Sequence, residues 1–263
     1  MNFIDANNVS LRYDVQGKGK PLVLIHEMGG SMESWDLVVP ALSAKRRVVR
    51  YDTRGAGSSE KIRGTLEIDT MTDDLIALLD ALGITEKVAL TGTAVGGAIA
   101  LHTAARCPDR VAAVIASSPA ISIPSKSSRE AALARVARFE TDGLRALVDG
   151  TADSGYPAEL RQDKARFAGF RARWLANDPA SFAVIYRMLA DMDLSGELPS
   201  IKCPALIIMG EYDRGRPRAL VEPIAKAIPG AKFKSLPTGH YAGLQTPELM
   251  VAEIEGFLGE VGF

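Results

Sequence analysis

Short apolar runs recur along the chain, and each ends in a turn signal before a segment with helical spacing. These runs predict strands at Pro21–Ile25, Arg47–Tyr51, Lys87–Thr91, Val111–Ser117, Ala205–Met209 and Lys232–Leu236. A nearly continuous apolar run is typical of a parallel strand covered on both faces. Near the start, Val9, Leu11 and Tyr13 alternate with polar residues and predict a hairpin. The pattern as a whole predicts an α/β fold with a mostly parallel sheet flanked by helices.

One amphipathic helix is well marked between the second and third runs. Its apolar face carries Leu75, Ile76, Leu79 and Leu82. Thr70 and Asp73 have the spacing of a capping box, and Gly83 is placed to stop the helix.

The alternation of strand-like runs and helical segments stops over residues 121–199, which are helix-forming and contain no strand-like run. Pro119, Pro124 and Pro199 mark the ends of this stretch. We interpret it as a helical cap inserted between two strands. The predicted core is then residues 1–120 and 200–263.

Composition narrows the possible partners. The chain has 31 basic and 32 acidic residues, a net charge of −1, which gives no electrostatic reason to bind nucleic acid or an anionic membrane. Cys107 and Cys203 form neither a disulfide framework nor a zinc spacing. No signal peptide or membrane-spanning run is visible. We expect a cytoplasmic protein, monomeric or homodimeric, acting on a small molecule.

The most informative segment reads LTGTAVGGAIAL, from Leu90 to Leu101. In the G-x-S-x-G nucleophile elbow, a serine occupies a strained turn between a strand and a helix. Gly92 and Gly96 have the required offsets, but Ala94 stands where the serine would be. Thr93 is one residue away and should point away from the tip of the turn.

An acid and a histidine follow in the order that a catalytic triad on this scaffold requires. Asp213 lies in the loop after one predicted strand, and His240 lies after the next. The carboxylate would orient the imidazole, which would take a proton from a nucleophile or from water. Glu211 is close enough in sequence to compete with Asp213 for this role.

Over nearly its whole length the chain resembles α/β-hydrolases of the 3-oxoadipate enol-lactonase-like branch. Besides the elbow, the resemblance is carried by IHEMGGSMESWD, YDTRGAGSSEK, WLANDPASFAVIYRMLADMDL, GEYD and GHYAGLQTPE. It implies an eight-stranded sheet with a helical cap and chemistry without a cofactor. It also implies that Ala94, Asp213 and His240 occupy the nucleophile, acid and base positions. The backbone N–H groups of Met28 and Val95 would form the oxyanion hole.

Two residues depart from the family pattern, Ala94 and Glu27, which stands where glycine is usual. A carboxylate at position 27 could face solvent, or it could face inward and repel a developing oxyanion. Buried and with a raised pKa, it could instead orient water or donate a proton.

Alanine cannot form an acyl-enzyme, so three hypotheses stay open. The chain could be an engineered, inactive serine-to-alanine form of a serine esterase or lactonase. It could be an enzyme in which His240 and Asp213 activate water against a labile ester, lactone, enamine or activated amide. It could also be a non-catalytic sensor on a hydrolase scaffold.

The substrate pocket is expected between the sheet and the helical cap. Candidate binding residues are Trp174, Tyr186, Arg187, Met188 and Trp35, with Phe170 as a further lining residue. Arg171, Arg173 or Arg187 could recognise a substrate carboxylate. No metal site is predicted, and Gly55-Ala56-Gly57 lacks the rest of a dinucleotide fingerprint, so no cofactor is implied.

Overall fold

The fold is described from a computed structural model, which covers residues 2–123 and 125–263. Met1 and Pro124, one of the prolines predicted to mark the helical stretch, lie outside the described residues. Within those ranges the strands are β1 (Asn2–Ala6), β2 (Val9–Gln16), β3 (Pro21–Ile25), β4 (Arg47–Tyr51), β5 (Val88–Thr93), β6 (Val111–Ser117), β7 (Ala205–Gly210) and β8 (Lys232–Leu236). They form one eight-stranded sheet in the order β1-β2-β4-β3-β5-β6-β7-β8.

Pairing within the sheet is parallel from β4 to β8, and antiparallel where β2 joins β1 and β4. The mostly parallel sheet predicted from the apolar runs is therefore confirmed. The central strand β5 extends two residues beyond its predicted end, because Gly92 and Thr93 pair with Ala116 and Ser117 of β6. Ala94 therefore comes immediately after the last paired residue of β5.

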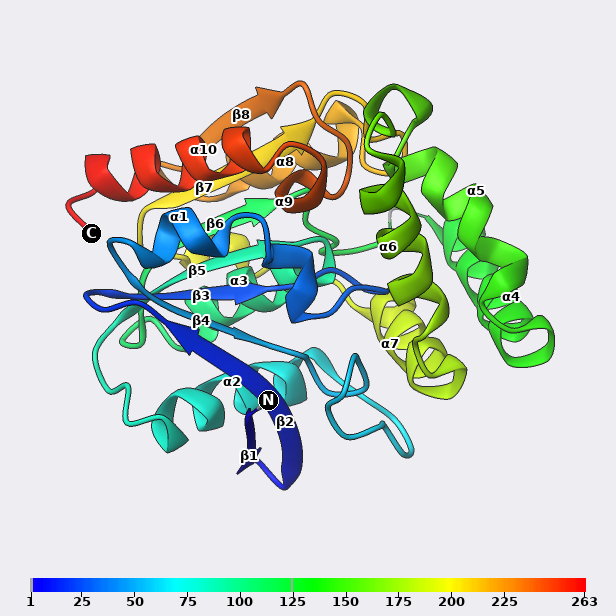
Figure 1. Cartoon of the computed structure of the whole chain (residues 1–263), viewed down its shortest axis with the longest axis horizontal. Coiled ribbons are helices and arrows are strands. Elements are labelled where there is room, and N and C mark those ends of the chain that lie inside the picture. Colours follow the sequence, from blue (N-terminus) through cyan, green and yellow to red (C-terminus); the bar gives the residue numbers. More distant parts are fainter. Residues whose placement is uncertain (1, 124) are drawn as a thin grey trace.

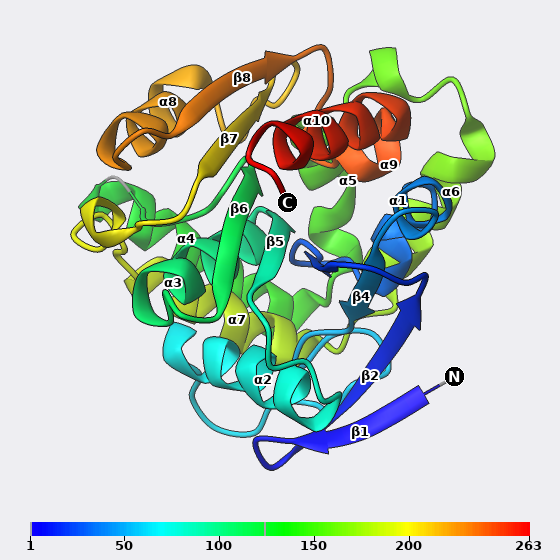
Figure 2. The same cartoon turned by 90° about the vertical axis from the view of Figure 1, so that its left-hand side faces the viewer.

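Helices cover both faces of the sheet. They are α1 (Val39–Ser43), α2 (Ile68–Ala81), α3 (Val95–Arg106), α8 (Arg218–Ala227), α9 (Ala242–Gln245) and α10 (Pro247–Glu260), with short 3-10 turns η1 (Met32–Trp35) and η3 (Leu198–Ser200). Figure 2 shows α2, α3 and α8 on one face and α1 and α10 on the other. Each face buries its own apolar cluster, so the sheet is a rigid platform at the centre of the core.

The boundaries of α2 correct one prediction and confirm another. The helix begins at Ile68, two residues before Thr70, and its N-cap Glu67 makes no side-chain capping bond. The capping box between Thr70 and Asp73 is therefore wrong, since Thr70 lies inside the helix. Gly83 does end it, with a φ of +66° that glycine adopts without strain.

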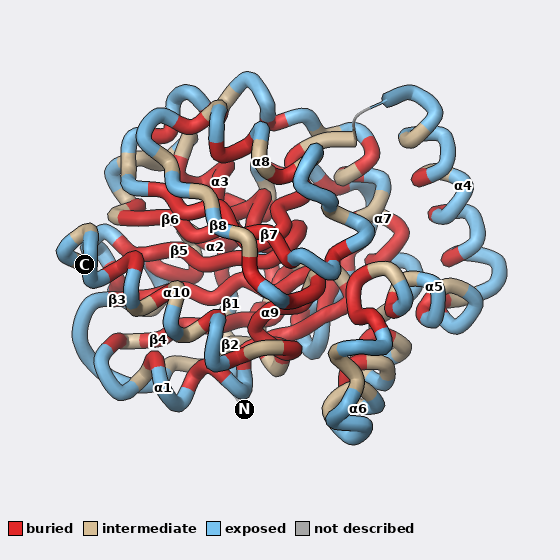
Figure 3. The backbone as a smooth tube through the Cα atoms, turned by 90° about the horizontal axis from the view of Figure 1, so that it is seen from above, coloured by how far each residue is buried: buried red, intermediate tan, exposed pale blue. Residues whose placement is uncertain are grey.

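Between β6 and β7 the chain forms α4 (Lys126–Asp142), α5 (Arg145–Gly155), α6 (Lys164–Leu175) and α7 (Pro179–Asp191), with a 3-10 turn η2 (Ala158–Leu160). We call these helices the helical insertion. Figure 1 shows them beside the edge of the sheet to which the arrow of β3 points, the carboxyl ends of the parallel strands. In Figure 3 much of the tube of α4 is exposed, whereas the central strands β3 to β7 are mostly buried. The exact limits 121–199 stay a prediction.

Candidate active site

The elbow between β5 and α3 has the backbone strain expected of a nucleophile turn. Ala94 has φ 52° and ψ −113°, a region that costs a residue with a side chain roughly 1–3 kcal/mol. Its N–H donates to Ser117 O at 2.9 Å, and its carbonyl accepts from the N–H groups of Ala98 and Ala120. These bonds hold the strained turn in place although the position carries no hydroxyl.

The glycines on either side allow the close approach that this turn requires. A Cβ at Gly92 would lie 2.1 Å from the carbonyl oxygen of Gly96. A Cβ at Gly96 would lie 2.3 Å from the carbonyl oxygen of Ile25 on β3. The G-x-x-x-G spacing is therefore explained by contact between backbones.

His240 and Asp213 meet beside this elbow. His240 Nδ1 lies 2.7 Å from Asp213 Oδ2. Asp213 is 3% exposed, and its Oδ1 accepts from the backbone N–H groups of Gly215 and Arg216, both at 3.0 Å. Because an ionised carboxylate only accepts, Nδ1 carries the proton and Nε2 is left with its lone pair.

The electrostatics of the pair favour an ionised Asp213. Burial raises the pKa of this carboxyl, but the charge and hydrogen bond of His240, together with the other hydrogen bonds to the carboxylate, outweigh burial, and the net shift is downward from the ordinary value of 3.8. The acid is therefore suited to hold the imidazole and to stabilise an imidazolium.

Contacts missed in the sequence fix the histidine loop. His240 N–H donates to Gly155 O at 2.8 Å, at the end of α5 in the helical insertion. The Gln245 side-chain amide donates to the same carbonyl at 2.9 Å, and its oxygen accepts from Tyr241 N–H. The glutamine within GHYAGLQTPE was the available signal, but its partner 90 residues away could not be inferred from sequence.

A cavity of about 480 Å³ opens above these groups. Ala94, His240 and Asp213 line its base, and so do Met28 and Val95, the predicted oxyanion residues. Val95 is the first residue of α3, so its N–H is one of the helix-terminal groups without an intrahelical acceptor. The structure thus brings the five predicted reaction-centre positions to one cavity.

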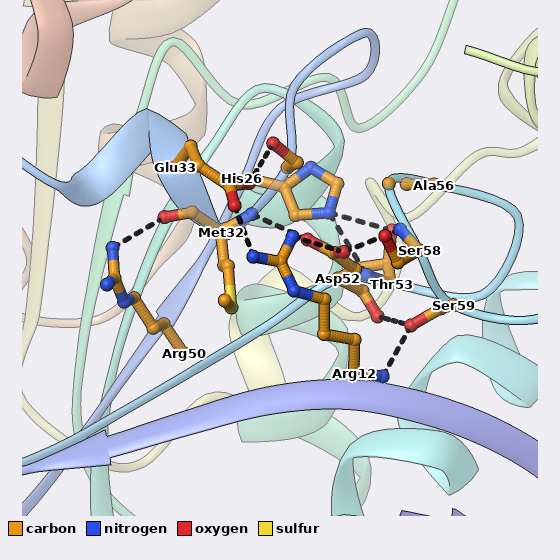
Figure 4. Close-up of polar contacts among 12 residues, drawn as sticks. Arg12, His26, Met32, Glu33, Arg50, Asp52, Thr53, Ala56, Ser58 and Ser59 are labelled. Atoms are coloured by element: carbon orange, nitrogen blue, oxygen red, sulfur yellow. Dashed lines mark hydrogen bonds and ion pairs between the residues drawn. The ribbon is translucent and has the colours of Figure 1, made fainter. Parts of the chain in front are cut away.

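The loop that carries Met28 is held by the network drawn in Figure 4. Buried His26 lies with Nδ1 2.7 Å from the carbonyl of Glu27, and its Nε2 accepts from Thr53 N–H at 3.0 Å. Further along, Asp52 Oδ1 accepts from Met32 N–H at 2.8 Å, while Arg50 donates to Met32 O at 3.1 Å. The backbone shape of the oxyanion loop is therefore set from both ends.

Asp52 is itself held by a basic residue from β2. Arg12 donates to Asp52 Oδ2 at 3.2 Å and also pairs with Glu33 of η1. Burial raises the pKa of Glu33, but its bonds from Arg12 and Ser31 bring it down to about 2. An ionic cluster therefore joins the first hairpin to the oxyanion loop.

Glu27 adopts an arrangement that sequence reasoning did not foresee. It is 3% exposed, so it does not face solvent, yet it does not line the main cavity. Its Oε1 accepts from Ser34 Oγ at 2.8 Å. A Cβ at Gly30 would lie only 2.4 Å from the same oxygen, so the absence of a side chain at Gly30 makes room for the carboxylate. The carboxylate therefore lies behind the oxyanion loop, next to Trp35, Thr93 and Tyr241.

Among the predicted binding residues, Trp174 and Tyr186 line the cavity. Trp35 is 1% exposed in the core under α10, and Met188 is buried in the core on the opposite face. Arg187 pairs on the surface with Glu140 at 2.8 Å. Phe170 belongs to the aromatic cluster that joins the helical insertion to Tyr241.

Two of the arginines proposed for carboxylate recognition also point elsewhere. Arg171 pairs with exposed Asp149 at 2.8 Å, and Arg173 does not line the cavity. The arginines that do line it are Arg135, Arg138 and Arg216, which sequence reasoning missed. The position of Arg216 three residues after Asp213, in the same loop, was the one available signal.

In residues 2–123 and 125–263, no group of three or more His, Cys, Asp or Glu side chains is arranged to hold a metal ion. Nor does this part of the chain contain a helix with the length and apolarity needed to cross a bilayer.

Comparison with known proteins agrees with this geometry. The family model Hydrolase_4, described as serine aminopeptidase S33, matches residues 18–239. The putative carbamate hydrolase RutD of Azorhizobium caulinodans is 27% identical over 272 residues, covering 99% of each chain. The 3-oxoadipate enol-lactonase 1 of Acinetobacter baylyi is 29% identical over 241 residues, covering 91% of this chain and 89% of the relative.

Among solved structures, the enol-lactonase of Burkholderia xenovorans LB400 matches with a TM-score of 0.93 and 29% identity. The match covers 98% of this chain and 100% of the other.

Proposed function

The chain belongs to the Hydrolase_4 family of α/β-hydrolases, and from this premise we propose that it hydrolyses a small, labile ester, lactone or carbamate by activating water directly. Its relatives named as enol-lactonase and carbamate hydrolase support this class of substrate. The observation that carries the mechanism is the 2.7 Å contact between His240 Nδ1 and buried Asp213, beside an elbow without a hydroxyl.

In the proposed reaction the substrate carbonyl lies over Ala94, with its oxygen toward the N–H groups of Met28 and Val95. Nε2 of His240 takes a proton from a water molecule as the water oxygen bonds to the carbonyl carbon. The carbonyl π electrons move to the oxygen, which the two amides stabilise. Asp213 stabilises the imidazolium formed in this step.

The tetrahedral intermediate then collapses. The bond from carbon to the leaving oxygen breaks, and the imidazolium proton passes to that oxygen, so His240 returns to its neutral form. General-base catalysis of this kind accelerates a reaction about 10²–10⁴-fold. Because no covalent intermediate forms, the reaction is not divided into two easier steps. The account therefore requires a substrate with an activated carbonyl.

A direct test follows the hydrolysis of 4-nitrophenyl acetate by the unsubstituted chain and by His240→Ala. We expect the substitution to reduce turnover about 10²–10⁴-fold. Glu27→Gln is the matched carboxylate variant and should change turnover less than about tenfold, because Glu27 does not line the cavity. Equal rates for His240→Ala and the unsubstituted chain would contradict the mechanism.

The preserved elbow also favours one alternative, an inactivated serine esterase. In that case the chain as it stands would be inert, and Ala94→Ser would be active. A sensor would bind a ligand and release no product, with or without His240.

A further inference from the structure

The charge of the cavity lining differs from that of the protein as a whole. The chain has a net charge of −1, yet the charged side chains lining the cavity, apart from His240, are Arg135, Arg138, Arg216 and Asp213. The Asp213 carboxylate already accepts hydrogen bonds from His240 and from two backbone amides. The cavity therefore presents an excess of positive charge to whatever enters it.

Arg216 is the innermost of these arginines. It is half-buried, whereas Arg135 and Arg138 on α4 are exposed. Within the described residues its guanidinium makes no hydrogen bond or ion pair, although its backbone N–H holds Asp213. Burial lowers the pKa of this guanidinium, and the charges of Asp213 and Tyr186 oppose that shift only in part. A partly buried arginine without an anionic partner is costly, because guanidinium stays charged in proteins.

Tyr186 lines the same cavity and contacts one of the exposed arginines. Its hydroxyl accepts from Arg135 Nη1 at 3.4 Å, and its ring packs edge-on against Phe139 at 5.4 Å between centroids. Tyr186 comes from α7, Arg135 from α4 and Arg216 from the loop after β7. Donors from three separate elements therefore line the same cavity.

Three other arginines of the helical insertion have carboxylate partners outside the cavity. Arg187 pairs with Glu140, and Arg171 pairs with Asp149, both at 2.8 Å. Arg161 pairs with Asp153 at 2.7 Å. Arg216, which has no such partner in the described part of the chain, contrasts with these three paired arginines.

From this contrast we infer that Arg216, assisted by Tyr186 and by Arg135 at the mouth, binds a carboxylate carried by the substrate. The inference rests on the proposed function and deepens it, because Ala94 and Arg216 line the same cavity of about 480 Å³. The carboxylate and the reacting carbonyl would belong to one small molecule. The planar guanidinium fork suits a carboxylate, and the exposed arginines would attract anions to the mouth.

The experiment measures binding without turnover, by calorimetric titration with 4-oxopentanoate and with its neutral methyl ester. We expect the unsubstituted chain to bind the carboxylate in preference to the ester. Arg216→Gln should weaken carboxylate binding at least ~10-fold, the usual cost of losing a hydrogen bond to a charged group. Arg216→Lys should recover part of the affinity, because it keeps the charge but loses the fork.

The matched control is Arg187→Gln, which removes a surface arginine of the helical insertion and should leave binding unchanged. Equal binding of acid and ester, no binding of the acid, or an Arg216→Gln affinity equal to the unsubstituted value would overturn the inference. Equal hydrolysis rates for His240→Ala and the unsubstituted chain would overturn the proposed mechanism alone, because that histidine is not required for the charge preference measured here.

Discussion

The two sides of the cavity are built in different ways. The sheet side contains the elbow, the His240–Asp213 pair and the oxyanion loop. Its carboxylates Asp52 and Asp213 are buried and accept hydrogen bonds from backbone N–H groups. The helical insertion has mostly exposed ion pairs and an aromatic cluster, and it contributes Trp174 and Tyr186 to the cavity. Rigid, backbone-held groups suit the chemical step, whereas side chains on separate helices suit the recognition of a particular substrate.

The comparison predicts unequal consequences for similar substitutions. On the sheet side, Asp213 fixes the tautomer of His240, and Asp52 holds the oxyanion loop through Met32 N–H. On the insertion side, an exposed pair such as Arg171 with Asp149 contributes about 0–1 kcal/mol.

The largest effect is expected for Asp213→Asn. An amide in this position can present a donor to Nδ1 and favour the wrong histidine tautomer, which in serine proteases costs about 10⁴-fold in turnover. Turnover of 4-nitrophenyl acetate by this variant should fall toward that of His240→Ala, by up to about 10²–10⁴-fold, with the cooperative unfolding transition retained. Asp149→Asn is the control on the helical insertion, and the comparison fails if both variants lose activity equally.

A smaller effect concerns stability against acid. The pKa of Glu33 is about 2, below the ordinary 4.5, so the stabilisation from its pairing with Arg12 is complete above pH 4.5 and is lost as pH falls through about 2. Glu33→Gln should cost on the order of 1–3 kcal/mol in urea unfolding at pH 7, and the difference should shrink toward zero in acid.

Glu140→Gln provides the matched control for this measurement, because Glu140 pairs with Arg187 on exposed surface. Its effect should be within about 1 kcal/mol at neutral pH. A Glu33→Gln difference that stays constant from pH 7 to acid would show that the cluster around Arg12 does not depend on the ionised carboxylate.

The smallest predicted effect tests strain at the elbow. Ala94→Gly removes a Cβ from a backbone with φ 52° and should stabilise the fold by up to ~1 kcal/mol, despite the greater freedom of glycine in the unfolded chain. Ala98→Gly, in the regular part of α3, should instead destabilise it by about 0.5–1 kcal/mol. The strain argument is refuted if urea unfolding shows the same loss for both.

The sequence was most informative where local pattern determines structure. Apolar runs located the central strands because a doubly covered parallel strand must be apolar on both faces. The elbow could be predicted because Gly92 and Gly96 are required by backbone contacts a few residues apart. The order of Asp213 and His240 after successive strands placed them at one edge of the sheet.

What could not be predicted depends on which way side chains point after distant segments pack. Trp35 and Met188 are large and apolar, and sequence does not tell a pocket lining from a core position. Glu27 folds back onto Ser34, a contact set by the turn at Gly30. Sequence alone does not distinguish Arg187 from Arg216. In the structure Arg187 pairs with Glu140, whereas Arg216 lines the cavity.

The most direct test of water activation at an alanine elbow is stopped-flow hydrolysis of 4-nitrophenyl acetate, with intact-mass analysis during turnover. The unsubstituted chain and Ala94→Ser are compared. We predict steady turnover by the unsubstituted chain, without a burst and without an acetyl adduct, and a burst with an acetyl adduct for Ala94→Ser. An inert unsubstituted chain beside an active Ala94→Ser would contradict the account, and would identify the alanine form as an inactivated serine hydrolase.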